Sequence, residues 1–131
     1  MRESQTAEAR PYHHGDLRRA LIDAASRLLE AEGPSALSLR AVAREAGVSP
    51  AAPSPHFQDK GELLDAVAHE GWTLLDQALA DAKAKAPSPR DAMNELGVAY
   101  VCFARENPAL YRVMYDTARH KEALPAEMQE G

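Results

Sequence analysis

Cysteine and long apolar runs are nearly absent from this sequence, and each absence excludes a class of protein. The 131 residues include one cysteine, Cys102, which by itself cannot form an internal disulfide or a cysteine metal cluster. No apolar run approaches the roughly 18 to 20 residues that cross a bilayer, and the polar start MRESQTAEAR lacks the apolar core of a signal peptide. We therefore expect a soluble, cytoplasmic protein in a reducing compartment.

Aromatic residues are also scarce, at 5% of the chain, whereas alanine is plentiful. Alanine is the strongest helix former, and its small side chain lets helices pack closely. This composition favours an all-α fold over a β-sandwich. With 45% hydrophobic residues, a chain of this length can bury one modest core.

The clearest local pattern lies between residues 39 and 60, LRAVAREAGVSPAAPSPHFQDK, and predicts two short helices joined by a tight turn. Apolar side chains recur on one face of the first helix, at Leu39, Val42, Ala43 and Ala46. Ser38 precedes this helix as an N-cap, and Gly47 follows it, where many helices end in the left-handed conformation. Ser49 and Pro50 are the expected cap and first residue of the second helix. Two helices in this order form a helix-turn-helix motif, whose second, recognition helix lies in the major groove of DNA.

The recognition helix, predicted from Pro50 to about Phe57, contains two prolines that weaken it. Pro53 and Pro55 have no amide proton to donate to the preceding turn. An interior proline costs roughly 3 kcal/mol relative to alanine, and Pro55 also pushes Ser54 away from helical dihedrals. We therefore expect a shortened or kinked helix, with Phe57 as its anchor in the core.

Three motifs follow one another between Tyr12 and Trp72: a capped first helix that ends at EG, the segment LSLRAVAREAGVS, and HF-x-DK at the start of a long helix. In this order they resemble the N-terminal DNA-binding domain of TetR-type transcriptional repressors. The later segment ARENPALYRVMYD resembles the start of the ligand-binding domain in one branch of that family. The resemblance implies an all-α protein, in which a three-helix helix-turn-helix domain is joined by a long fourth helix to a partial helical ligand-binding and dimerisation domain. The corresponding divisions are a flexible arm (1–11), the DNA-binding domain (12–58) and a partial regulatory domain (59–131).

The first helix is expected to begin with Asp16 as its N-cap and to end before Gly33. Its apolar face consists of Leu17, Leu21, Ala24, Leu28 and Leu29. Arg18 and Arg19 then fall on the opposite, solvated side near its start. There they could contact phosphate, although an ordinary exposed face explains them equally well.

Three further helices are expected after the helix-turn-helix motif. Asp59 and Glu62 form a capping box for a long fourth helix that reaches about residue 84. Ser88 caps a fifth helix, and Pro108 opens a sixth. The apolar face predicted for the fifth helix consists of Met93, Leu96, Tyr100, Val101 and Phe103.

The net charge of −5 is unevenly distributed, which matters for a protein predicted to bind DNA. Residues 1–60 contain eight basic and eight acidic side chains, whereas residues 61–131 contain seven basic and twelve acidic ones. The acidity therefore lies in the part assigned away from DNA. A neutral DNA-binding part attracts phosphate only weakly, so its contacts must come from a few placed groups.

Eight residues are candidates for DNA contact in this interpretation. Lys60 is the strongest, because it lies at an exposed helix N-terminus where phosphate is attracted most strongly. Arg40 is the preferred cation of the preceding helix. The alanines suit thymine methyl groups, the serines suit phosphate or a base edge, and His56 suits phosphate. The full set is Ser38, Arg40, Ser49, Ala51, Ala52, Ser54, His56 and Lys60.

This chain departs from the family pattern within the recognition helix. Similar proteins usually have a tyrosine or another aromatic residue at the position of Ser54 and a polar or basic residue at Pro55. Loss of the aromatic phosphate contact weakens the expected affinity. The segment is therefore compatible with a weakened DNA-binding motif, with an altered operator, or with a degenerate copy.

The resemblance also implies a small-molecule pocket walled by the later helices. Five residues are candidate lining residues: Trp72, Met93, Tyr100, Phe103 and Tyr111. A plain hydrophobic core explains the same spacing, so both interpretations stay open.

Metal binding and catalysis have little support in the sequence. His13, His14 and Asp16 contain metal-ligating groups, but neighbours along a chain do not face one point, and no third ligand lies at helical spacing. Cys102 is predicted on an apolar helical face with no histidine three or four residues away, as expected of a buried small hydrophobe. We expect no metal, no cofactor and no enzymatic activity.

Two functions remain to be distinguished. The first is a ligand-responsive repressor that binds a double-stranded DNA operator and a small-molecule effector, as a homodimer if the final helices of the family are present. The second is a helical interaction module, or a degenerate relative that has lost DNA binding. The sequence stops before the helix pair that forms the family dimer interface, so we expect either a fragment or dimerisation through another surface. The first interpretation also requires that PAAPSPHF winds into enough helix to present its small side chains.

Overall fold

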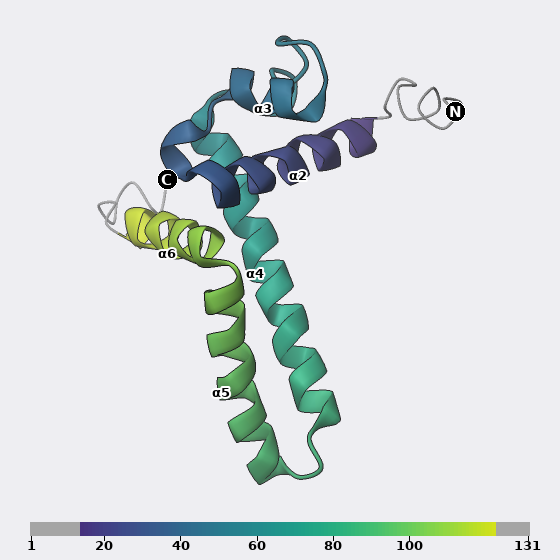
Figure 1. Ribbon diagram of the computed structural model, residues 1–131, viewed down its shortest axis with the longest axis vertical. Helices are drawn as coiled ribbons and strands as arrows, with labels where there is room; N and C mark the ends of the chain where they lie inside the picture. Colours follow the sequence, from purple (N-terminus) through teal and green to yellow (C-terminus); the bar gives the residue numbers. More distant parts are fainter. Residues whose placement is uncertain (1–13, 123–131) are drawn as a thin grey trace.

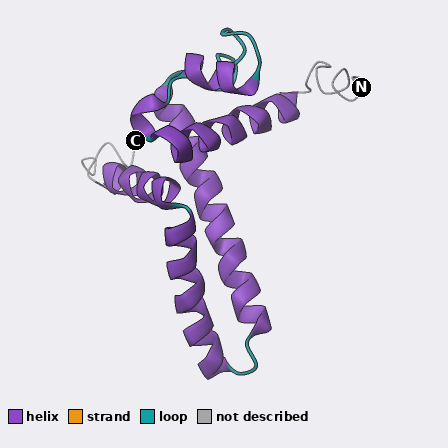
Figure 2. Cartoon of the chain, in the orientation of Figure 1, coloured by secondary structure: helices purple, strands orange, loops and turns teal. Residues whose placement is uncertain are grey.

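The computed structural model describes residues 14–122, with side chains described over residues 16–119. The predicted arm (1–11), His13, the side chain of His14 and the residues from Ala123 onward lie outside this description. The described chain forms helices and loops without strands, as Figure 2 shows, and this confirms the predicted all-α fold. No helix in the described range is long and apolar enough to span a membrane.

Five α-helices and one short 3-10 helix make up the described chain. In chain order they are α2 (His14–Glu32), the 3-10 helix η1 (Pro34–Ala36), α3 (Leu39–Ala46), α4 (Lys60–Lys85), α5 (Pro89–Glu106) and α6 (Pro108–Glu122). Figure 1 shows α4 and α5 running side by side in opposite directions, with α2 and α3 gathered at the end where α4 begins. Helix α6 packs against both α4 and α2, and so connects the two halves of the molecule.

The ends of α3 form as the sequence predicts. The Ser38 hydroxyl accepts a hydrogen bond from the Ala41 amide at 3.0 Å, which satisfies a donor of the first turn. Gly47 has a φ of 77°, in the left-handed region that a side chain with a Cβ rarely adopts. The Val48 amide then donates to the Ala43 carbonyl at 3.0 Å and closes the helix.

The caps of α4 and α5 also match the prediction. An oxygen of Asp59 accepts from the Glu62 amide at 3.0 Å, and Glu62 reaches back to accept from the Gln58 amide at 2.8 Å. The Ser88 hydroxyl accepts from the Asp91 amide at 3.1 Å. Both helices therefore have a satisfied first turn, in which an acidic side chain also faces the positive end of the helix dipole.

Helix α2 begins at His14, three residues before Leu17, the first helical residue that the predicted Asp16 cap implies. Asp16 therefore lies in the first turn and is not the N-cap. A carboxylate is favourable at either position, because both lie close to the exposed amides and positive dipole at the start of the helix.

The recognition helix predicted over residues 50–57 is absent, and this is the main correction to the sequence analysis. Residues 50–56 form consecutive turns. Their amides reach back three residues, from Ala52 to Ser49 at 3.0 Å, from Ser54 to Ala51 at 3.3 Å, and from His56 to Pro53 at 2.9 Å. The physical reason is the one anticipated: Pro53 and Pro55 remove two amides that an α-helix would need, so each turn closes on itself and none extends into an α-helix.

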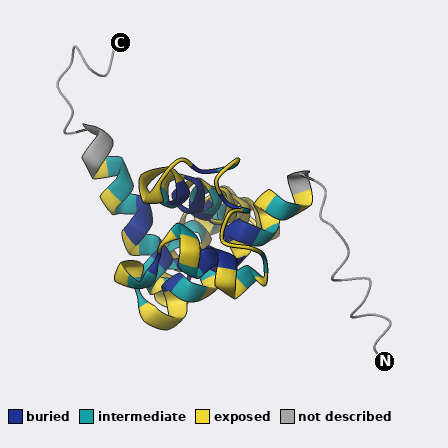
Figure 3. Ribbon diagram, turned by 90° about the horizontal axis from the view of Figure 1, so that it is seen from above, coloured by how far each residue is buried: buried dark blue, intermediate teal, exposed yellow. Residues whose placement is uncertain are grey.

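The core joins all five α-helices. Figure 3 shows buried residues toward the middle of the molecule and exposed ones on the outer turns. The largest fully buried side chains are Phe57, Leu21, Leu29, Leu63, Met114, Val42, Val67 and Pro53. The predicted apolar face of α2 packs into this core, with Leu21, Ala24 and Leu29 fully buried.

A close approach between α4 and α6 depends on Gly71. A Cβ at this position would lie 2.6 Å from the sulfur of Met114 and 3.0 Å from a methyl carbon of Leu110. Both of those side chains are buried, so a side chain at residue 71 would force Met114, or the helix that carries it, to shift.

The apolar face predicted for α5 is only partly buried. Phe103 is 7% exposed and faces the core, but Met93 is 75% exposed and Val101 55% exposed. Cys102 is exposed as well, contrary to the prediction that it is buried. The difference arises because α4 and α6 pack against one side of α5, whereas sequence periodicity cannot show how much of an apolar stripe a neighbour covers.

Candidate nucleic-acid interface

The eight predicted DNA-contact residues come from the start of α3, the residues 49–56 that we call the turn segment, and the first residue of α4. Figure 1 shows these three pieces at one end of the molecule. Six of the eight are exposed, and Ala52 and His56 are half-buried. The exposed ones are Ser38, Arg40, Ser49, Ala51, Ser54 and Lys60.

The turn segment has an inner and an outer side although it is not a helix. Pro53 is fully buried, and Phe57, which follows the segment, is 2% exposed. Ala51, Ser54 and Pro55 are exposed on the outside. The segment is therefore anchored in the core from within, and it presents small side chains to solvent.

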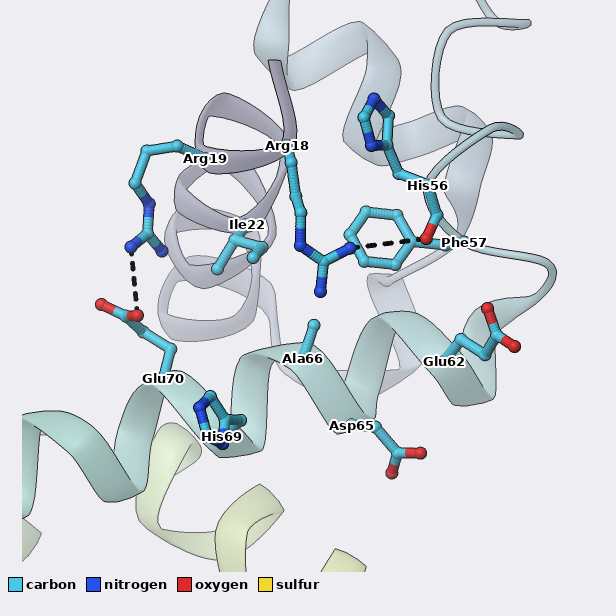
Figure 4. A pocket seen from close by; sticks show the side chains of 10 residues that line it. All are labelled: Arg18, Arg19, Ile22, His56, Phe57, Glu62, Asp65, Ala66, His69 and Glu70. Atoms are coloured by element: carbon cyan, nitrogen blue, oxygen red, sulfur yellow. Dashed lines mark hydrogen bonds and ion pairs between the residues drawn. The ribbon is translucent and has the colours of Figure 1, made fainter. Parts of the chain in front are cut away.

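Arg18 braces the turn segment from α2, a role that the sequence analysis missed. Its guanidinium carbon lies 4.9 Å from the centre of the Phe57 ring, a cation–π contact, and Nη1 lies 3.5 Å from the His56 carbonyl oxygen. Figure 4 shows the guanidinium extended across the ring toward that carbonyl. Arg18 is separated along the sequence from His56 by 38 positions and from Phe57 by 39 positions. No local spacing in the sequence could therefore have predicted these contacts.

Arg19 connects α2 to α4. Its Nη1 lies 3.1 Å from a carboxylate oxygen of Glu70, and its Nε lies 3.4 Å from Asp23 on the same helix. Figure 4 shows the first of these pairs beside an open cleft of about 500 Å³. Its walls carry both arginines and three acidic side chains, and the Arg19–Glu70 pair joins α2 to α4 across it.

A third ion pair fixes α3 against α2. Arg27 Nε lies 3.1 Å from a carboxylate oxygen of Glu45. Exposed pairs of this kind stabilise by at most about 1 kcal/mol each. The Arg27–Glu45 pair therefore adds to the apolar contacts between α2 and α3 and does not by itself hold the two helices together.

The structure brings together three of the five predicted ligand-lining residues. Trp72, Tyr100 and Tyr111 gather around Tyr115, which the sequence analysis did not single out. Ring centres are 5.1 Å apart for Trp72 and Tyr115, 4.8 Å for Tyr111 and Tyr115, and 6.2 Å for Tyr100 and Tyr111. Phe103 is buried in the core, and Met93 lies apart on the outer side of α5.

Hydrogen bonding joins the tyrosine hydroxyls of this cluster. The hydroxyls of Tyr100 and Tyr115 form a hydrogen bond, which raises the pKa of Tyr100. A side-chain hydrogen bond with Tyr100 likewise raises the pKa of Tyr111. The hydroxyls of Tyr100 and Tyr111 therefore remain protonated at neutral pH and can donate hydrogen bonds.

Metal-ligating side chains do not gather in the described part of the chain. Over residues 16–119 no three His, Cys, Asp or Glu side chains are grouped so that they could hold an ion. The features that remain for function are the exposed surface around the turn segment and the aromatic cluster of the second half.

Comparison with known proteins identifies the first of these regions. The family model "Bacterial regulatory proteins, tetR family" matches residues 21–67, which include most of α2, all of α3, the turn segment and the start of α4. This match identifies residues 21–67 as a TetR-family region. The HTH-type transcriptional regulator BetI of Rhizobium meliloti (strain 1021) is 37% identical over 111 residues, which are 82% of this chain and 54% of BetI.

Solved structures agree with this assignment. A protein of unknown function from Rhodococcus sp. RHA1 is 46% identical, with a TM-score of 0.74, over 89% of this chain and 59% of that one. A TetR family transcription regulator from Marinobacter aquaeolei VT8 is 26% identical, with a TM-score of 0.63, over 87% of this chain and 59% of that one. The chain thus spans between half and three fifths of the length of these three proteins.

Proposed function

We propose that this chain is the DNA-binding and partial regulatory portion of a ligand-responsive transcriptional repressor. One observation carries the proposal: the TetR family match covers the whole helix-turn-helix region, and six of its eight predicted contact residues are exposed there. The outer side of the turn segment is not covered by another part of the described chain, since Ala51, Ser54 and Pro55 are exposed. The sequence analysis required a helix here to present the small side chains, and that helix is absent. The proposal rests instead on the exposure of these side chains in the described chain, which does not depend on a helix.

The candidate residues divide into phosphate contacts and base contacts. Lys60 is exposed at the N-terminus of a 26-residue helix, where the dipole and the first amides favour a phosphate. At the start of α3, Ser38 is the N-cap and Arg40 is the second helical residue. Ala51 and Ser54 lie on the turn segment, where one suits a thymine methyl group and the other a hydrogen bond to a base edge or phosphate.

Regulation would follow from a shift between two conformations. An effector that binds one arrangement of α4 more tightly than another increases the fraction of molecules in that arrangement. It thereby changes the fraction in which Lys60 and the turn segment are positioned to contact DNA. A homodimer would place two such surfaces on half-sites about one helical turn apart, and a single chain would lose the second set of contacts.

The first test measures binding to a labelled duplex taken from the DNA that flanks the chain's own gene. We expect a gel shift at low salt, and we expect Lys60→Ala to weaken it several-fold and to lower the salt dependence by about one charge. Lys85→Ala is the matched control, since Lys85 is exposed at the opposite end of the same helix and should leave binding unchanged. Absence of a shift at every salt concentration contradicts the proposal.

The turn segment favours a second candidate function, that of a helical interaction module which has lost DNA binding. The specific observation is that residues 50–56 form turns where the family resemblance implied a helix. Under this alternative the wild-type chain does not bind the duplex, and the double variant Ser54→Tyr with Pro55→Arg regains binding. Binding by the wild-type chain excludes the alternative.

A further inference from the structure

A second groove lies away from the DNA end, between the last turns of α5 and one face of α6. It has a volume of about 660 Å³. Arg105 comes from α5, whereas Arg112 and Arg119 come from α6, seven residues apart and so on one face of that helix. This groove is distinct from the cleft shown in Figure 4, which shares no lining residue with it.

The side chains that line this groove are mainly basic, whereas the surrounding part of the chain is acidic. Residues 61–131 contain seven basic and twelve acidic side chains, yet three of those seven basic ones line the groove. Asp116 is its single acidic lining residue, and it forms an ion pair with Arg119. Asp116 therefore does not neutralise the guanidinium groups of Arg105 and Arg112, which also line the groove.

One wall of the groove is aromatic. Tyr111 and Tyr115 both line it, with ring centres 4.8 Å apart and planes inclined by 52°. Trp72 packs edge-on behind Tyr115 at 5.1 Å, which holds the ring in place. A planar molecule could lie against such a wall, because offset and tilted aromatic contacts are favourable.

We propose that the groove binds a planar aromatic carboxylate, with the acid group held by Arg105 and Arg112 and the ring placed against Tyr111 and Tyr115. Guanidinium groups match carboxylates because they can donate two parallel hydrogen bonds. The aromatic wall selects against small inorganic anions. This assignment rests on the proposed function, in which it supplies the chemical class of the effector.

The position of the groove fits an effector site. A bound acid would connect α5 to α6, and α6 packs on α4, which carries Lys60 at its start. Helix α6 is also connected to α2, because the Leu110 amide donates to a carboxylate oxygen of Glu30 at 3.1 Å. Occupation of the groove therefore acts on a helix that contacts two elements of the DNA-binding half.

Calorimetric titration of the full 131-residue chain tests the proposal, with 2-naphthoate, its neutral amide and inorganic phosphate as probes. We expect one molecule of 2-naphthoate to bind per chain, and both other probes to bind at least tenfold more weakly. Arg112→Gln should weaken naphthoate binding about tenfold, since a hydrogen bond between charged groups is lost. Arg90→Gln, a substitution of an exposed arginine at the far end of α5, should leave it unchanged.

Three results would overturn the assignment. Equal affinity for the amide removes the role of the charge, equal affinity for phosphate removes the role of the aromatic wall, and an unchanged affinity in Arg112→Gln places the acid elsewhere. All titrations are done without DNA, and the gel-shift test is done without a ligand. Failure of one proposal can therefore be distinguished from failure of the other.

Discussion

Individual residues set the distance between packed helices, and Gly71 is the clearest case. We expect Gly71→Ala to destabilise the chain by about 1 to 3 kcal/mol, because the new methyl group would overlap the buried Met114 side chain. Gly97→Ala is the matched control: it lies in α5 with nothing within 4 Å of the added Cβ, and it should stabilise by up to about 1 kcal/mol through helix propensity. Urea unfolding measures both changes. Equal effects in the two variants would refute the packing argument.

The residue scale also shows what local sequence can and cannot predict. The Ser38 cap and the left-handed Gly47 depend on neighbours within four residues, and both were predicted correctly. Arg18 over Phe57 and the exposed Cys102 depend on which helices pack together. Residue type and spacing carry no information about such contacts. The sequence analysis therefore placed Arg18 correctly on an exposed face but missed its contact with Phe57, and it wrongly expected Cys102 to be buried.

Among the elements, the turn segment differs from the helix that the family resemblance implies, because Pro53 and Pro55 lack amide protons. We expect Pro55→Ala to raise the helical signal at 222 nm and to strengthen duplex binding, because an exposed ring is replaced by a residue that can donate its amide. Pro53→Ala regains an amide as well, but it removes a fully buried ring and should cost about 1 to 2 kcal/mol of packing. Circular dichroism and urea unfolding separate the two effects. An unchanged spectrum in Pro55→Ala would show that Pro55 by itself does not prevent a helix here.

Element boundaries were predictable where caps and prolines mark them. The limits of α3, α4, α5 and the start of α6 lie within about one residue of the prediction, since each is set by a side chain next to it in sequence. The recognition helix was expected to be shortened or kinked, and the structure replaces it entirely. Two prolines within three residues leave too few amides to nucleate a helix, and the expectation had assumed that the rest of the segment could compensate.

At the scale of the whole molecule, the two halves are joined by a contact that spans 80 residues. Glu30 in α2 accepts a hydrogen bond from the Leu110 amide in the first turn of α6, where a carboxylate is favourable. We expect Glu30→Ala to lower the free energy of unfolding by about 1 kcal/mol and to accelerate hydrogen exchange at the Leu110 amide. Glu32→Ala, a substitution of an exposed acid in the same last turn of α2, is the control. Identical protection of Leu110 in all three proteins would show that the contact is not formed in solution.

The close packing of Gly71 against Met114 and Leu110 would make this residue the pivot if α4 tilted as a rigid helix. From that glycine to Lys60 is about 16 Å at 1.5 Å per residue, so a tilt of about 5° displaces Lys60 by about 1.5 Å. A charge-assisted hydrogen bond does not survive a displacement of that size, since its length falls within a few tenths of an ångström. A rotation of only a few degrees at the close contact between α4 and α6 would therefore be enough to misplace Lys60.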